Sequence, residues 1–189
     1  MTEFKAIPQE DDEWVTKAQT HPQYFDFLYE KYFSKIYIFV YKRTYNEVLS
    51  GELCSNVFYK ALLHIKQFKN QGFPFSSWLF KIASNEISMH FRNKSNAERH
   101  LHIESTYLQA IADEYDFEKE KTIQILENII PQLTEAEIQL IEFRFFEARS
   151  FKEIGYLLNI SADNAKIKTY RIVDKLKTLI KQLSTNDEI

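Results

Sequence analysis

Apolar residues recur at intervals of three and four positions along most of this 189-residue sequence, which is the spacing of one buried helix face. The first clear run lies between Pro22 and Thr44, and a second begins near Val48 and continues to Ile65. Residues 1–20 are acidic and mixed, and we expect them to form a frayed or loosely docked lead-in. The pattern predicts a pair of core-building helices after this lead-in.

A third helix is predicted over residues 75–94, after a loop that is rich in aromatic residues. Gly72 and Pro74 interrupt the helical period in the loop. Ser76 or Ser77 can cap the helix, because a serine hydroxyl accepts hydrogen bonds from the unpartnered N–H groups at a helix start. The basic end of this helix makes the segment suited to holding nucleic acid. Its predicted buried face consists of Trp78, Leu79, Ile82, Ala83, Ile87 and Phe91.

The C-terminal part of the sequence marks its helix starts clearly. Thr134-x-x-Glu137 and Ser150-x-x-Glu153 both match the capping box, in which the first side chain caps a backbone donor and the glutamate reaches back. Each motif therefore predicts the start of a helix.

A helix-turn-helix unit is predicted directly after the second of these motifs. Asn159 tolerates the left-handed conformation that ends helices, and Ser161 can cap the next, polar and basic helix. Gly155 supplies a small residue where the two helices approach each other. Such a unit places its second helix in the major groove of DNA, where base edges can be distinguished. The inner face of that helix is expected to carry Ala165, Thr169, Ile172 and Leu176.

Composition favours an all-α fold, because three glycines and four prolines leave few chain breaks. No apolar stretch approaches membrane-spanning length, and residues 1–20 lack the basic start and apolar centre of a signal peptide. Cys54 is the single cysteine, so an internal disulfide is impossible, which fits a reducing compartment. We therefore expect a soluble, cytoplasmic protein without direct membrane insertion.

The formal net charge of −3 conceals an uneven distribution. Residues 60–99 and residues 144–182 each carry a net charge of +5, whereas residues 100–143 carry −8. Local charge decides the attraction to phosphate, because ordinary salt screens charges beyond about 10 Å. The two basic segments fit nucleic-acid binding, but charge alone fits solvated helix faces equally well.

Other classes of function fit less of the sequence. A stand-alone helix-turn-helix regulator with an N-terminal sensor or dimerisation domain leaves the loop and helix at residues 68–94 unexplained. An enzyme finds no support, since there is no phosphate-cradling glycine loop, no G-x-S-x-G and no Cys/His cluster with zinc spacing. His100-x-His102 could bind a metal, but a lone histidine pair in a linker is usually incidental. We predict no catalysis, cofactor, metal or small-molecule substrate.

The predicted domain organisation follows these patterns. A lead-in covers residues 1–20, a first helical domain residues 21–95, and a second helical domain residues 123–184. Between the domains, residues 96–122 form a linker, because helical periodicity weakens there and acidic residues accumulate.

Both halves resemble the same family, the bacterial RNA polymerase sigma factors of the sigma-70 superfamily, in their extracytoplasmic-function (ECF) type. FDFLYEKYFSKIYIFVYKRT looks like the first segment of the family, and ELCSNVFYKALLHIKQF resembles the helix that docks on the polymerase clamp. FPFSSWLFKIASNEISMHFRNK resembles the promoter-melting helix with its W-L-x-x-I-A-x-N core. LTEAEIQLIEFRFFEARSFKEIGYLLNISADNAKIKTYRIVDKLK is similar to the C-terminal promoter-reading domain. The resemblance covers most of residues 22–183.

The resemblance implies a transcription initiation factor built from a sigma region 2-like helical bundle and a region 4-like helix-turn-helix domain. Such a factor binds the clamp helices and flap of core RNA polymerase, recognises the minus-ten and minus-thirty-five promoter elements, and promotes DNA opening. An anti-sigma factor is an expected further partner. The stand-alone regulator remains the alternative.

The resemblance also implies three sets of contact residues. Core polymerase would meet Glu52, Leu53, Asn56, Val57 and Lys60. The minus-ten element would meet Phe68, Lys69, Asn70, Phe73, Phe75, Trp78, Lys81, Asn85, His90 and Arg92, where Trp78 is equally compatible with the helical core. The minus-thirty-five element would meet Asp163, Asn164, Lys166, Ile167, Lys168 and Arg171.

Two positions depart from the family pattern. Asn56 stands where an acidic residue is common, and Thr169 replaces a larger apolar residue in the recognition helix. The first leaves the strength of one polymerase contact open, and neither threatens the predicted fold.

Overall fold

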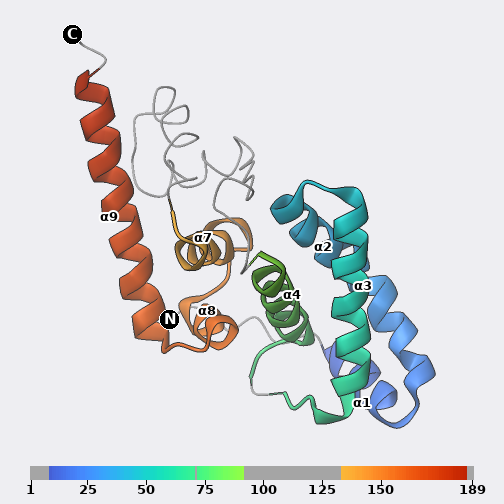
Figure 1. Cartoon of the computed structure of the whole chain (residues 1–189). Coiled ribbons are helices and arrows are strands. Elements are labelled where there is room, and N and C mark those ends of the chain that lie inside the picture. The colour runs from blue at the N-terminus through green and yellow to red at the C-terminus, as the bar shows by residue number, and fades with distance from the viewer. Residues whose placement is uncertain (1–8, 71, 92–132, 187–189) are drawn as a thin grey trace. The chain divides into compact units, whose positions relative to one another are not determined.

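The computed structural model describes residues 9–70, 72–91 and 133–186, and the chain divides into two compact units, residues 1–95 and residues 96–189 (Figure 1). Every regular element among the described residues is helical, which confirms the all-α prediction of two helical domains. The predicted linker at residues 96–122 lies outside the described residues.

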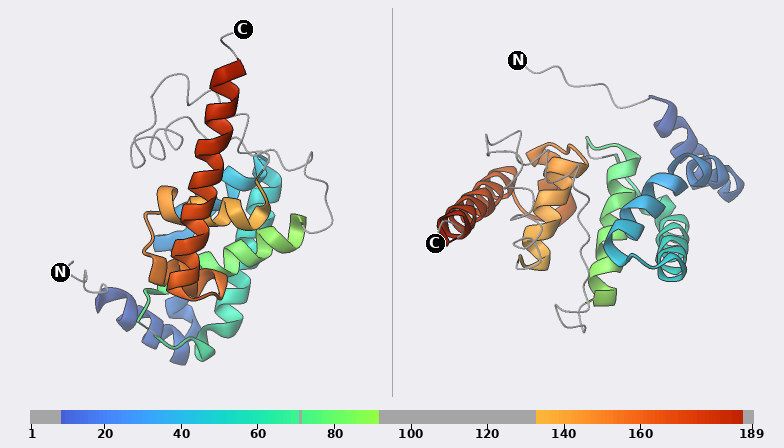
Figure 2. Two further views of the ribbon diagram at one scale, coloured as in Figure 1. Left: turned by 90° about the vertical axis from the view of Figure 1, so that its left-hand side faces the viewer. Right: turned by 90° about the horizontal axis from the view of Figure 1, so that it is seen from above.

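In the first unit, α3 packs against both α2 and α4, and these two helices also contact each other (Figures 1 and 2). The side chains between them are fully buried and include Leu28, Ile36, Phe75, Leu79 and Ile87. The elements of this unit are α1 (Gln9–Thr20), η1 (Pro22–Tyr24), α2 (Phe25–Thr44), α3 (Glu47–His64), η2 (Ile65–Gln67) and α4 (Phe75–Phe91). The predicted helix pair and the helix after the loop are thus present.

Helix α1 corrects the expectation of a loosely docked lead-in. Asp11 is fully buried, and its carboxylate accepts hydrogen bonds from Lys31 Nζ at 2.6 Å and from the Tyr32 hydroxyl. Buried charges persist only with such partners, and both partners belong to α2. The apolar Val15 and Ala18 side chains are buried with it, so residues 9–20 are an integral part of the first unit.

Helix α4 begins at Phe75, so Ser76 and Ser77 lie in its first turn and the predicted serine cap is wrong. The Ser77 N–H donates to the Pro74 carbonyl at 2.9 Å, and the buried Phe75 side chain anchors the helix start one residue earlier. Leu79, Ala83, Ile87 and Phe91 are buried as predicted. Trp78 and Ile82 of the predicted buried face are only half-buried.

The second unit contains α7 (Glu135–Ile141), η5 (Glu142–Phe146), α8 (Phe151–Leu158) and α9 (Ala162–Asn186). The capping box before α7 is confirmed: the Thr134 hydroxyl accepts from the Glu137 N–H, and the Glu137 carboxylate accepts from the Thr134 N–H at 2.7 Å. Burial would raise the pKa of Glu137, but hydrogen bonds from Thr134 and Lys175 outweigh burial and lower it. Lys175 lies on α9, so this carboxylate also ties α9 to the start of α7.

The turn between α8 and α9 has the predicted helix-turn-helix geometry. Asn159 adopts the left-handed conformation with φ 55°, and the Ser161 hydroxyl accepts from the Asn164 N–H at 3.1 Å. A Cβ at Gly155 would lie 2.7 Å from the Ile160 carbonyl oxygen, which is closer than real Cβ atoms come. Any larger residue at Gly155 would therefore push the turn away from α8.

Candidate nucleic-acid interface

A pocket of about 460 Å³ opens in the first unit between α3, η2 and α4. Its volume falls within the range of small-ligand sites. The pocket is lined by Lys60, His64, Gln67, Phe68, Trp78, Ile82, Asn85 and Glu86. In this pocket, residues from the loop and helix at 68–94 therefore meet residues of α3, the preceding helix.

Aromatic rings form the apolar wall of this pocket. The Trp78 ring centroid lies 5.1 Å from that of Phe68 and 5.5 Å from that of Phe75. Trp78 is half-buried, whereas Phe75 is 1% exposed and sits behind it. Trp78 therefore packs on the core and also lines an open pocket, so this structure is compatible with a core role and with contact to DNA.

The polar side of the pocket combines an ion pair with an amide. Lys60 Nζ lies 2.5 Å from Glu86 Oε1, which joins α3 to α4, and the Glu86 side chain is 8% exposed. A carboxylate so deeply buried needs a cationic partner. Asn85 is exposed at the rim, and its amide offers both hydrogen-bond donors and an acceptor. The pocket can thus hold a flat, polar-edged group against an aromatic wall.

The structure corrects part of the predicted minus-ten set. Phe68 and Phe75 are 8% and 1% exposed, so neither ring is available to stack on a base in this conformation. Phe73 is half-buried, and Lys69 and Asn70 are exposed on the loop. The family resemblance implied both Phe68 and Phe75 as contacts of the minus-ten element, but their rings pack against each other with centroids 5.4 Å apart and are buried. Arg92 lies outside the described residues.

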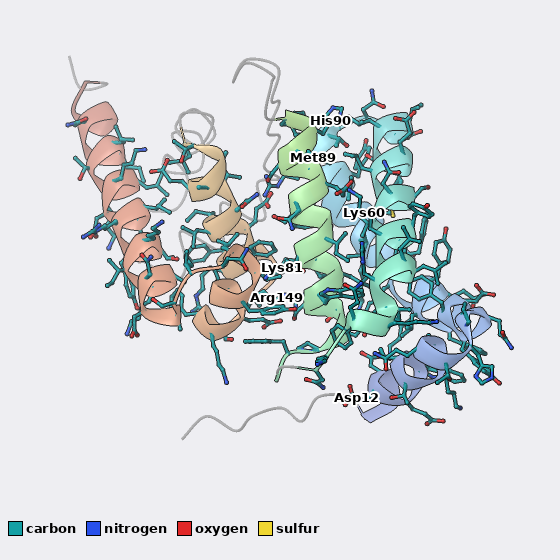
Figure 3. The ribbon with its side chains drawn as sticks, turned by 60° about the horizontal axis from the view of Figure 1, so that its bottom comes forward. Asp12, Lys60, Lys81, Met89, His90 and Arg149 are labelled. Carbon is teal, nitrogen blue, oxygen red and sulfur yellow. The ribbon has the colours of Figure 1, made fainter. Side chains whose placement is uncertain are left out.

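Two further predicted minus-ten residues lie on α4 outside the pocket lining. Lys81 and His90 are both half-buried, and burial lowers the pKa of Lys81. Figure 3 labels both, with His90 and its exposed neighbour Met89 at the C-terminal end of the helix. The structure therefore gathers Trp78 and Asn85 in one site and leaves Lys81 and His90 apart from it.

The predicted polymerase-binding set on α3 spans two faces of the helix. Glu52 and Asn56 are exposed, but Leu53 and Val57 are 6% and 0% exposed and belong to the core. Buried side chains cannot contact a partner, so these two assignments are wrong. Lys60 lines the pocket, where it forms the ion pair with Glu86.

The exposed face of α3 carries apolar residues that sequence reasoning missed. Val48, Tyr59 and Leu63 are 75%, 61% and 56% exposed. Together with Glu52 and Asn56 they recur every three or four residues along the helix, so the five side chains form one stripe, here called the α3 stripe. The outward direction of Glu52 and Asn56 follows from the sequence, but the apolar residues on the same side gave no sign that they are exposed.

On α9, all six predicted minus-thirty-five residues are exposed. The predicted inner face is buried: Ala165, Ile172 and Leu176 are at most 4% exposed, and the buried Thr169 hydroxyl donates to the Ala165 carbonyl at 2.8 Å. This bond explains how a threonine replaces a larger apolar residue there. Tyr170 is an exposed neighbour that the prediction omitted, with Lys166 Nζ 5.9 Å from its ring centroid.

The described part of the chain contains no group of three or more potential metal ligands, and His100 and His102 lie outside it. Among the same residues, no helix is long and apolar enough to cross a membrane.

Comparisons with known proteins match both units. Residues 28–97 match the Sigma-70 region 2 family and residues 129–178 match the Sigma-70 region 4 family. The chain is 25% identical to the ECF RNA polymerase sigma factor BldN of Streptomyces coelicolor, over 89% of this chain and 65% of BldN. It is 26% identical to the RNA polymerase sigma factor SigZ of Bacillus subtilis, over 81% of this chain and 85% of SigZ.

A further relative, the ECF RNA polymerase sigma factor SigM of Bacillus subtilis, is 22% identical over 86% of this chain and 98% of SigM. A chain of the solved RsbN–BldN complex aligns with 87% of this chain and 98% of its own length, with 23% identity and a TM-score of 0.39. The region 2 match covers the half that a stand-alone helix-turn-helix regulator leaves unexplained, so that alternative is not favoured. The two region matches in their order along the chain, together with the sigma-factor relatives, establish that the chain belongs to the sigma-70 family of transcription initiation factors, as a member of the extracytoplasmic-function type.

Proposed function

We propose that the chain binds core RNA polymerase, recognises the minus-ten and minus-thirty-five elements of promoters, and promotes DNA opening. The observation that supports this most directly is the pocket between α3, η2 and α4, because it joins an aromatic wall to hydrogen-bonding groups on the region 2 unit. Strand separation requires a place for a base that has left the double helix.

In this proposal, the pocket receives one unpaired base of the minus-ten element. Stacking on an aromatic ring contributes about 1–3 kcal/mol per base, which offsets a cost of a few kcal/mol for unstacking and unpairing. Trp78 supplies the ring surface, and Asn85 supplies donors and an acceptor for the edge of the base. Lys69 lies on the loop after η2 and Lys81 lies on α4, and their positive charge would attract the phosphates of the DNA strand.

The α3 stripe is the surface that we propose for core polymerase. Exposed tyrosine and leucine side chains are suited to burial in an interface, and tyrosine is among the residues that most often dominate binding energy. Glu52 and Asn56 would supply polar contacts between them. An anti-sigma factor remains a proposed further partner of this unit or the second.

The exposed side of α9 is proposed to enter the major groove at the minus-thirty-five element. Its side chains include cationic groups that can bond phosphates and polar groups that can read base edges. The acting residues would be Asp163, Asn164, Lys166, Ile167, Lys168 and Arg171. Together these steps require binding alone, so we propose that the protein has no catalytic activity of its own and acts in the cytoplasm beside RNA polymerase.

Run-off transcription tests the proposed function. The purified chain added to core RNA polymerase is expected to direct transcripts from promoters found by sequencing RNA after the chain is overproduced. Core polymerase alone should give no such transcripts. Binding of the chain to duplex promoter DNA without polymerase, with no stimulation of transcription, would favour the stand-alone regulator instead.

The minus-thirty-five assignment predicts a salt-dependent loss of binding. Lys168→Ala together with Arg171→Ala should weaken holoenzyme binding to promoters that retain the minus-thirty-five element, because two cationic side chains leave the exposed side of α9. The slope of log K against log salt should fall by about 2 if both contact phosphate. Gel-shift titrations at several salt concentrations measure this slope, and Lys177→Ala on the same helix is the control. If the slope and the affinity were unchanged, Lys168 and Arg171 would not belong to the DNA interface.

A further inference from the structure

We propose that helix α1 is a brace that sets the shape of the base-capture pocket, with Gln19 and Asp12 as positioning residues. This inference rests on the proposed role of the pocket in holding a minus-ten base. Neither residue lines the pocket itself. Both bond instead to the chain between η2 and α4, from which part of the pocket wall is built.

Gln19 holds the end of η2. Its Nε2 donates to the carbonyl oxygen of Ile65 at 3.1 Å and to that of Phe68 at 2.9 Å. The Ile65 carbonyl also accepts from the Phe68 N–H at 3.1 Å, so the Gln19 amide adds a second hydrogen bond to the single turn of η2. The Phe68 carbonyl follows that turn, at a position where carbonyl groups lack partners within the helix. Phe68 and Gln67 line the pocket, so the Gln19 amide fixes the backbone on both sides of pocket residues.

Asp12 holds the loop that follows. Its two carboxylate oxygens accept from Asn70 Nδ2 at 3.1 and 3.3 Å, while Asn70 Oδ1 accepts from the Gly72 N–H at 2.9 Å. Gly72 has φ 84°, a conformation that glycine adopts without strain. The Asn70 side chain therefore spans from the turn of the loop to α1, and Figure 3 labels Asp12 on that helix. The Asn70 side chain thus has bonds within the protein, while its contact with the minus-ten element stays a prediction.

The brace is itself anchored in the core. Asp11, next to Asp12 in sequence, is fully buried and bonded to Lys31 and Tyr32 of α2. Tyr32 in turn packs against Phe75, with ring centroids 6.0 Å apart, and Phe75 backs Trp78. Helix α1 thus contacts the rigid core on one side and the pocket-forming loop on the other. A loop held at several points is pre-organised, so a captured base does not have to order it.

A donor–acceptor exchange tests the brace. In Asn70→Asp, a carboxylate faces Asp12, and the holoenzyme should bind fork-junction DNA with an unpaired minus-ten strand about threefold to tenfold more weakly. The double variant Asp12→Asn with Asn70→Asp exchanges donor and acceptor and should restore binding to within about twofold. Gln19→Glu, which places a carboxylate beside two carbonyl oxygens, should also weaken binding about threefold to tenfold. Core polymerase affinity should stay within about twofold throughout.

Thr16→Ala is the matched control, since this exposed α1 hydroxyl bonds only within its own helix, and it should bind as the unaltered protein does. Asn85→Ala is measured in parallel to separate the two hypotheses. If Asn85→Ala loses binding while the α1 variants do not, the brace is wrong and the pocket stands. If Asn85→Ala also binds normally, the pocket assignment fails and the brace with it. If core polymerase affinity fell in parallel, or if the exchanged double variant did not recover binding, α1 would stabilise the unit as a whole and would not position the pocket.

Discussion

Trp78→Ala is expected to reduce promoter opening by between about fivefold and about 150-fold, with core polymerase binding unchanged. The range corresponds to the loss of about 1–3 kcal/mol of base–aromatic stacking. Trp78 is suited to this role because it is half-buried, packs on Phe68 and Phe75, and still lines the pocket. Permanganate reactivity of unpaired thymines measures opening, and co-purification titrations measure core binding.

Two companion variants separate stacking from general damage. Trp78→Phe keeps an aromatic ring and should retain most of the opening activity. Asn85→Ala removes an exposed amide at the pocket rim, so it should change stability little and still lower opening. Glu30→Ala, an exposed residue of α2 outside the pocket, is the control. Equal losses of opening and core binding in Trp78→Ala and Asn85→Ala would contradict a base-binding role.

Tyr59→Ala combined with Leu63→Ala is expected to weaken core polymerase binding by about thirtyfold or more. Truncating one dominant interface residue costs about 2 kcal/mol or more, which sets the thirtyfold minimum, and both side chains are more than half exposed on the α3 stripe. Since neither is buried, the free energy of unfolding should stay nearly unchanged. Titration of labelled core polymerase measures the affinity, and urea unfolding measures stability.

The opposite face of the same helix supplies the contrast. Leu53→Ala removes a side chain that is 6% exposed and should lower the free energy of unfolding by about 2–5 kcal/mol. Met89→Ala, an equally exposed apolar residue on α4, controls for the loss of surface apolar area. If Leu53→Ala weakened polymerase binding without destabilising the protein, or if the α3 stripe variant bound normally, the orientation assigned to α3 would be wrong.

Local signals in the sequence were sufficient at three backbone features of the second unit, although they misplaced the start of α4 in the first. The capping box at Thr134 and Glu137, the left-handed Asn159 and the close approach at Gly155 are present as predicted. Each depends on contacts within a few residues along the chain, so neighbours in space are neighbours in sequence. The inner face of α9 was predictable for a related reason, because its polar and apolar sides differ clearly.

The sites on the first unit were less predictable because the deciding contacts join distant parts of the chain. Glu52 and Asn56 mark the outer side of α3, but Tyr59 and Leu63 on that side are apolar, and only packing against α2 and α4 leaves them exposed while Leu53 and Val57 are buried. Phe68 and Phe75 were expected to contact the minus-ten element, but in the folded chain both rings are buried in the core. Residues 9–20 looked like a loose lead-in because the partners of Asp11 and Gln19 lie between 20 and 49 residues away.

The sequence by itself determined that this chain is all-helical, where the helix-turn-helix lies, and which family it belongs to, since helical period, caps and family motifs are local properties. Only the tertiary structure decided that Tyr59 and Leu63 are exposed on α3, and that Trp78 and Asn85 share a pocket with Lys60 and Glu86. It also decided that α1 holds the loop beside that pocket. The physical reason is that burial and hydrogen-bond partners belong to the folded chain as a whole, and no period along the sequence encodes which segments will meet.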